Sequence, residues 1–73
     1  MDERDASARE TQAAMVRALA RTADVRRQQG RPSDAVRLYH QALALCDAAL
    51  GPDAAERDAI LKGLALAEDP QRR

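Results

Sequence analysis

The fold of this chain is decided by residues 19–50, LARTADVRRQQGRPSDAVRLYHQALALCDAAL. Apolar residues recur every three or four positions on both sides of a short turn at 30–33, which is the spacing of amphipathic helices. Gly30 suits the left-handed conformation found just past many helix ends, and Pro32 suits the first turn of the next helix. This stretch therefore predicts a helical hairpin.

The hairpin helices have recognisable ends. The first helix is expected from about Ala6 to Gln29. The second opens at Pro32, with Ser33 as its N-cap, and ends at 51–52, where Gly is followed by Pro.

A third helix follows the second Gly-Pro turn. Asp53 with Glu56 three residues later resembles a capping box, and Asp-Pro at 69–70 is expected to stop the helix. Gly63 lies inside this helix, where Gly costs about 1 kcal/mol relative to Ala. It either permits a close helix crossing or is merely tolerated.

The length and composition agree with one small all-α domain. The chain has 73 residues, one aromatic side chain and many good helix formers. The expected organisation is a polar N-terminal segment at 1–10, a three-helix antiparallel bundle at 11–69 and a short tail at 70–73.

The helical periodicity also predicts a core. The residues of the first helix expected to face inward are Met15, Ala18, Leu19, Thr22, Ala23 and Val25. Those expected on the opposite, exposed side are Arg17, Arg21, Asp24 and Arg27. The predicted core consists of Leu19, Ala35, Leu38, Tyr39, Ala42, Leu45, Cys46, Ile60 and Leu64.

Charge and cysteine content exclude several classes of function. Lys plus Arg equals Asp plus Glu, at 12 each, so binding of nucleic acid through phosphate neutralisation is not expected. The charges are segregated, with a basic first helix and acidic second and third helices. No apolar run approaches the length of a membrane span, no signal peptide is recognised, and the single Cys46 suits a reducing compartment. A cytoplasmic protein is therefore expected.

Catalysis, metal binding and a cofactor are not expected. His40 and Cys46 are the one conceivable base and nucleophile, but they lie six residues apart on one helix. That spacing turns one outward and the other inward. A metal site needs three or four converging ligands, which one His and one Cys do not supply.

The hairpin resembles a tetratricopeptide repeat of the kinesin-light-chain-like variety. Gly30, Ala35, Tyr39 and Ala42 match that family's turn and helix pattern in type and spacing, and the resemblance covers about residues 15–67. Ala23 and Arg26 depart from the pattern, at positions where the family often has Gly and an aromatic residue. The resemblance implies a non-catalytic protein-interaction module, or adaptor, that binds a peptide.

A microtubule-interacting-and-trafficking domain is the second resemblance. Such domains are three-helix bundles with a similar Gly, Ala, Tyr, Ala pattern, and Ala67-Glu68 is similar to their end. This resemblance implies binding of helical tails from ESCRT-type subunits. A purely structural homo-oligomeric bundle is the third alternative.

Two surfaces are the candidate sites. Arg17, Asp24 and Arg27 are the expected partner-binding strip, suited to an acidic peptide. Leu61 and Leu66 are the expected self-association residues, because the core is thin and the apolar arc of the third helix is wide. A homo-dimer or larger assembly is therefore expected.

Overall fold

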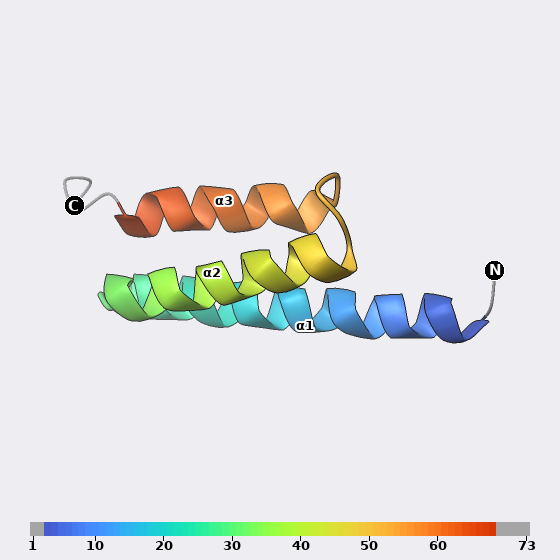
Figure 1. The fold of residues 1–73 in the computed structure, drawn as a ribbon. Helices are drawn as coiled ribbons and strands as arrows, with labels where there is room; N and C mark the ends of the chain where they lie inside the picture. The colour runs from blue at the N-terminus through green and yellow to red at the C-terminus, as the bar shows by residue number, and fades with distance from the viewer. Residues whose placement is uncertain (1–2, 69–73) are drawn as a thin grey trace.

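The chain folds into three α-helices. The computed structural model describes the backbone of residues 3–68 and the side chains of residues 7–68. The helices are α1 (Glu3–Gln28), α2 (Pro32–Ala49) and α3 (Ala55–Glu68), and this part of the chain contains no strand. Each helix runs antiparallel to the one before it (Figure 1). The predicted all-α, three-helix bundle is confirmed.

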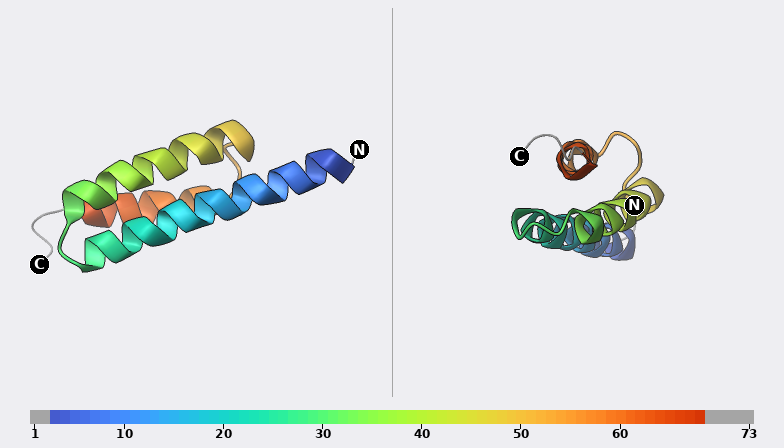
Figure 2. Two further views of the ribbon diagram at one scale, coloured as in Figure 1. Left: turned by 90° about the horizontal axis from the view of Figure 1, so that it is seen from below. Right: turned by 90° about the vertical axis from the view of Figure 1, so that its left-hand side faces the viewer.

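The central element of the bundle is α2. It packs against both α1 and α3, whereas α1 and α3 touch each other least. The amino-terminal end of α1 extends beyond the loop that joins α2 to α3 (Figure 2), so the molecule is elongated, at 47 × 19 × 14 Å. The helix begins at Glu3, earlier than the expected Ala6, and takes in most of the segment expected to be a separate polar end.

Two glycines make the turns. Gly30 has a φ of 77° and Gly51 a φ of 93°, both in the left-handed region, as their places past the helix ends predict. The expected N-cap at Ser33 is wrong. Pro32 is already the first residue of α2, the cap position belongs to Arg31, and no side chain caps this end.

The expected capping box of α3 is also wrong. The helix begins at Ala55, so Asp53 does not occupy the position before its first residue. Glu56 instead forms an ion pair with Arg17 of α1. The expected stop at 69–70 and the tail at 70–73 lie outside the described residues.

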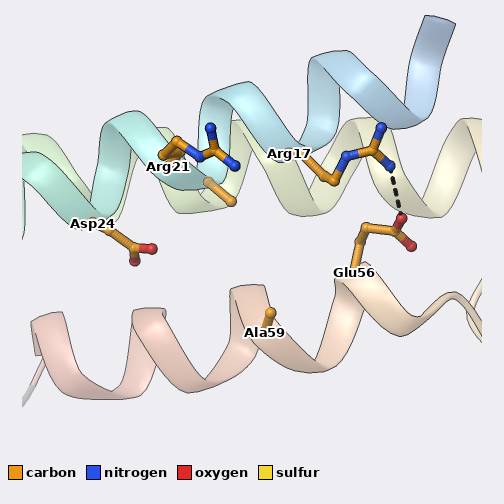
Figure 3. Close-up of a pocket in the computed structure, with 6 residues that line it drawn as sticks. Arg17, Arg21, Asp24, Glu56 and Ala59 are labelled. Atoms are coloured by element: carbon orange, nitrogen blue, oxygen red, sulfur yellow. Dashed lines mark hydrogen bonds and ion pairs between the residues drawn. The ribbon is translucent and has the colours of Figure 1, made fainter.

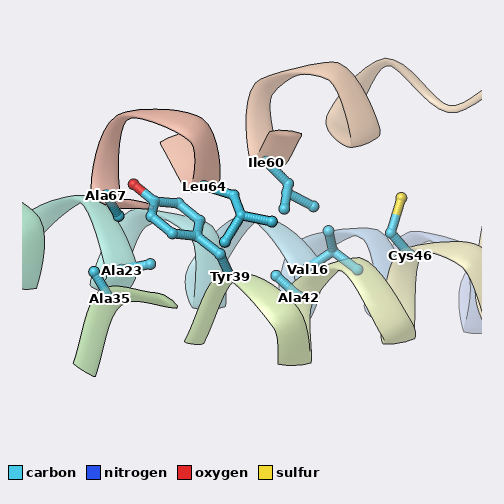
Figure 4. Close-up of a cluster of buried hydrophobic side chains, with 9 residues drawn as sticks. All are labelled: Val16, Ala23, Ala35, Tyr39, Ala42, Cys46, Ile60, Leu64 and Ala67. Atoms are coloured by element: carbon cyan, nitrogen blue, oxygen red, sulfur yellow. The ribbon is translucent and has the colours of Figure 1, made fainter. Parts of the chain in front are cut away.

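A small apolar core joins the three helices (Figure 4). Six of the nine predicted core residues are buried: Ala35, Tyr39, Ala42, Cys46, Ile60 and Leu64. The other three, Leu19, Leu38 and Leu45, are partly buried and pack against this cluster. The buried residues missing from the predicted core are Val16, Ala23, Gly63 and Ala67.

The expected inward side of α1 is wrong. The side that packs against the core is rotated around the helix axis by about 100°, or roughly one residue, from the side expected. Val16 is fully buried, whereas Met15 is 50% exposed, Val25 is 45% exposed and Thr22 lies on the surface. Ala23 is buried, as expected. The arginine-bearing side of α1 consequently lies next to the core instead of opposite it.

The close packing of α3 on α2 depends on Gly63. A Cβ atom at this position would lie 2.5 Å from Cε1 and from Cζ of Tyr39, and 2.6 Å from its hydroxyl oxygen. Only a residue without a side chain fits there while the ring of Tyr39 keeps its place. Gly63 is therefore required by a close contact with the Tyr39 ring of α2, and is not merely tolerated.

Candidate functional site

A groove lined by charged side chains lies between α1 and α3. Its volume is about 180 Å³. Figure 3 shows the charged side chains of both helices along its two sides. The lining residues are Arg17, Ala20, Arg21 and Asp24 from α1, and Glu56 and Ala59 from α3.

The periodicity of α1 explains this lining. Arg17, Arg21 and Asp24 stand four and three residues apart, so successive turns of α1 place them on the same side. Ala20 and Ala59 are small and leave space between the two helices. The groove exists because α1 and α3 meet mainly through α2 and approach each other with short side chains.

An ion pair spans the groove near the start of α3. Nη1 of Arg17 donates to Oε2 of Glu56 at 3.3 Å (Figure 3). The Arg17 side chain is still 55% exposed, and an exposed pair of this kind contributes at most about 1 kcal/mol to stability. Arg17 therefore remains available to a ligand that offers a better anion.

A hydrogen-bonded cluster forms the other end of the groove. The hydroxyl of Tyr39 donates to Oδ1 of Asp24, and Nε of Arg27 donates to the Tyr39 oxygen at 3.3 Å. Nη2 of Arg27 lies 3.6 Å from Oδ1 of Asp24. Asp24 and Arg27 thus connect α1 to the hydroxyl group of Tyr39, a buried core residue of α2.

The environment of Tyr39 keeps it protonated. Burial raises the pKa of its phenol above the ordinary value, and the Asp24 carboxylate raises the pKa further, while the Arg27 hydrogen bond acts in the opposite direction. The pKa of Arg27 is also raised, mainly by its hydrogen bond to Tyr39. The phenol is therefore a hydrogen-bond donor to Asp24 at neutral pH.

Arg21 differs from its neighbours in the groove. It lies one turn from Arg17 and is exposed. Within the described part of the chain, Arg17 pairs with Glu56 and Arg27 with Asp24, whereas Arg21 makes no ion pair. Among the described residues, Arg21 is thus the one charged side chain of the groove lining that makes no ion pair.

The predicted partner-binding strip lies on one side of α1, but it is not fully exposed. Arg17, Asp24 and Arg27 share one side of α1, yet all three are engaged within the molecule, and Arg27 is only 28% exposed. Sequence reasoning missed Arg21 as a site residue, although its spacing places it on the same side. It also missed Glu56, because no sequence signal shows which turn of α3 lies beside Arg17.

The two expected self-association residues do not share a face. Leu61 and Leu66 stand five residues apart, which separates them by about 140° around the helix. Leu66 is 43% exposed, whereas Leu61 is partly buried.

The residues considered for catalysis lie as their spacing predicts. His40 is exposed and Cys46 is fully buried. Burial raises the pKa of the Cys46 thiol, so the nucleophilic thiolate is disfavoured. Among the described residues, no three His, Cys, Asp or Glu side chains come together where they could hold a metal ion. None of the helices described here has the length and apolarity to cross a membrane.

Comparisons with known proteins give no significant match to a family model, to a curated protein or to a solved structure.

Proposed function

We propose that this protein is a non-catalytic protein-interaction module that holds an extended acidic peptide segment of a partner in the groove between α1 and α3. The observation that carries the proposal is Arg21, which makes no ion pair with the described residues and lies inside a groove with small side chains, next to the exposed guanidinium of Arg17. The hairpin's resemblance to tetratricopeptide repeats supports the same class of function.

Charge and shape favour a peptide with carboxylates. A carboxylate of the ligand bonds to Arg21, and a second one competes with Glu56 for Arg17, because guanidinium groups bind carboxylates through two parallel hydrogen bonds. Ala20 and Ala59 leave room for the backbone of an extended segment. At the far end, Asp24 is held by Tyr39 and Arg27 and repels further acidic residues, which fixes where the acidic part of the ligand lies.

Fluorescence anisotropy with a labelled peptide of alternating Glu and Gly tests the proposal. Binding is expected to weaken as NaCl rises from about 50 to about 500 mM, because salt screens exposed charges. Arg21→Ala should weaken binding by up to about fivefold, the range of one exposed ion pair, and Arg17→Ala with Arg21→Ala by more.

Arg37→Ala provides the matched control. Arg37 is a 72% exposed arginine of α2, and it is absent from the groove lining. A peptide with Gln in place of Glu controls for binding that does not depend on charge. The proposal is wrong if the Gln peptide binds equally well, or if the loss of Arg37 weakens binding as much as the loss of Arg21.

A further inference from the structure

Two rows of partly exposed apolar side chains remain on the bundle, one along each side of α2. Among the described residues, the largest fully buried side chains are those of Tyr39, Ile60, Val16 and Cys46. The leucines of α2 pack against this core but stay in contact with water. Covering them with another molecule would remove apolar surface from water, which favours association.

The first row lies where α2 meets α3. Nε of Arg57 donates to Oδ1 of Asp47 at 2.9 Å, so these two turns of α3 and α2 lie side by side. Leu43 and Leu61 each lie one turn further from the connecting loop, so they lie opposite one another. Further along, Val36 lines a shallow hollow with the last residues of α3. We call Val36, Leu43 and Leu61 the α2–α3 edge.

The second row lies where α2 meets α1. Met15 stands two residues before Arg17, which faces α3, and two residues rotate a helix position by about 160°. Met15 is therefore turned away from α3, and it is 50% exposed. Leu38 stands two residues after Val36, and Leu45 two residues after Leu43. The same rotation of about 160° therefore turns Leu38 and Leu45 away from the α2–α3 edge. We call Met15, Leu38 and Leu45 the α1–α2 edge.

The charges beside the α1–α2 edge are mainly positive. Asp34 is shared between Arg31 at 3.0 Å and Arg37 at 3.5 Å. Arg26 lies on the same side of α1 as Met15, and it donates a hydrogen bond to the uncharged Gln29. Among the described residues, three arginines thus stand against a single carboxylate.

The charges beside the α2–α3 edge are mainly negative. Asp47 and Arg57 neutralise each other. Asp58 and Glu68 are exposed and stand three residues before and seven residues after Leu61, on its side of α3, and the exposed Lys62 stands one turn after Asp58, so two carboxylates stand against one ammonium group here. Counted over the described residues, the two edges are therefore both apolar along their length and opposite in net charge.

We propose that the chain self-associates head to tail, with the α1–α2 edge of one copy packed on the α2–α3 edge of the next. A two-fold dimer would place identical edges, and therefore like charges, against each other, whereas head-to-tail packing pairs opposite charges. Each added copy leaves one edge of each kind free, so the contact continues into a chain or closes into a ring. The groove between α1 and α3 is the third side of the bundle and stays open in every copy.

Sedimentation equilibrium on single variants and on their mixture tests this geometry. The mass of the wild-type protein should rise with concentration above that of one 8.0 kDa chain. Met15→Glu blocks only the α1–α2 edge and Leu61→Glu only the α2–α3 edge, so each variant alone should remain a single chain. Their mixture should form a dimer, because each variant supplies the edge that the other lacks.

Two matched controls separate the edges from the general effect of a new charge. Val25 is 45% exposed on α1 and Leu66 is 43% exposed on α3, and neither belongs to an edge. Val25→Glu and Leu66→Glu should associate like the wild-type protein. Asp58→Arg with Glu68→Arg changes only exposed residues, so it provides a second block of the α2–α3 edge if Leu61→Glu lowers the helix content.

Three results would overturn the proposal. The first is a single-chain mass for the wild-type protein at all concentrations, and the second is an edge variant that associates normally. The third is a mixture that stays monomeric, which would indicate a contact between identical surfaces. None of these depends on peptide binding, since Arg17 and Arg21 lie on neither edge.

Discussion

At the scale of single residues, Gly63 and Tyr39 set how closely α3 approaches the other two helices. The Tyr39 ring passes under Gly63, and its hydroxyl is held on the far side by Asp24 and Arg27. The ring tip therefore cannot move aside freely. A sequence shows that a glycine in a helix is unfavourable, but it does not show which side chain makes the glycine necessary.

Gly63→Ala should destabilise the protein. Helix propensity alone would stabilise it by about 1 kcal/mol, but overpacking of a tight core costs about 1–3 kcal/mol, and the new Cβ would lie 2.5 Å from the ring. We expect a net loss, measured as a Tm several degrees lower, since about 1 kcal/mol shifts Tm by about 4–8 °C in a domain of this size.

A double-mutant cycle identifies the cause of that loss. In a Tyr39→Leu background the ring is absent, so Gly63→Ala should become neutral or stabilising relative to Tyr39→Leu alone. An unchanged penalty in that background would show that the backbone of α3, and not the ring, requires glycine.

At the scale of the helices, the sequence predicts where helices form better than how each is oriented. The buried side of α2 follows from the spacing of Ala35, Tyr39 and Ala42, and all three are buried. The orientation of α1 does not follow, because this helix is rich in alanine and carries its larger apolar residues, such as Met15, on several sides. Helical periodicity also assigns arginines to solvent, whereas Arg27 lies against the core through its bond to Tyr39.

The two ends of α2 provide a prediction at this scale. Its last turn has no basic residue, but Nη2 of Arg9 in α1 donates to the carbonyl oxygen of Leu50 at 3.2 Å. A cation at a carboxyl-terminal helix end contributes about 0.3–1 kcal/mol. Arg9→Ala should therefore lower the free energy of unfolding in urea by about 0.5 kcal/mol.

Ser33→Ala is the contrasting change at the other end of α2. Because no side chain caps this end, its effect should fall below about 0.5 kcal/mol, the usual size for a surface substitution. A loss of about 1 kcal/mol, typical of a removed N-cap, would show that Ser33 caps the helix in solution after all.

At the scale of the whole molecule, the α1 side of the groove could be predicted from the sequence, and the α3 side could not. The spacing of charged residues indicates that Arg17 and Asp24 share a side of α1. The role of Glu56 depends on how α3 is aligned with α1, which is set by Ile60 and Leu64 packing in the common core. Such an alignment is a property of the assembled bundle, so periodicity within one helix does not contain it.

The stability of the whole fold should fall at alkaline pH. Tyr39 and Cys46 are both fully buried, and burial raises the pKa of each above its value in the unfolded chain. The folded state thus holds these two protons more tightly, and their contribution to stability is complete below about pH 8.5, the ordinary pKa of a thiol. It is lost as pH rises through the raised pKa values of the thiol and the phenol. Thermal unfolding followed by circular dichroism between about pH 7 and about pH 11 should show a falling Tm.

Tyr39→Phe keeps the ring but removes the titrating proton, so its Tm should fall less steeply above about pH 10. Equal slopes for Tyr39→Phe and the wild-type protein would mean that the phenol titrates as it does in water and is not held by Asp24.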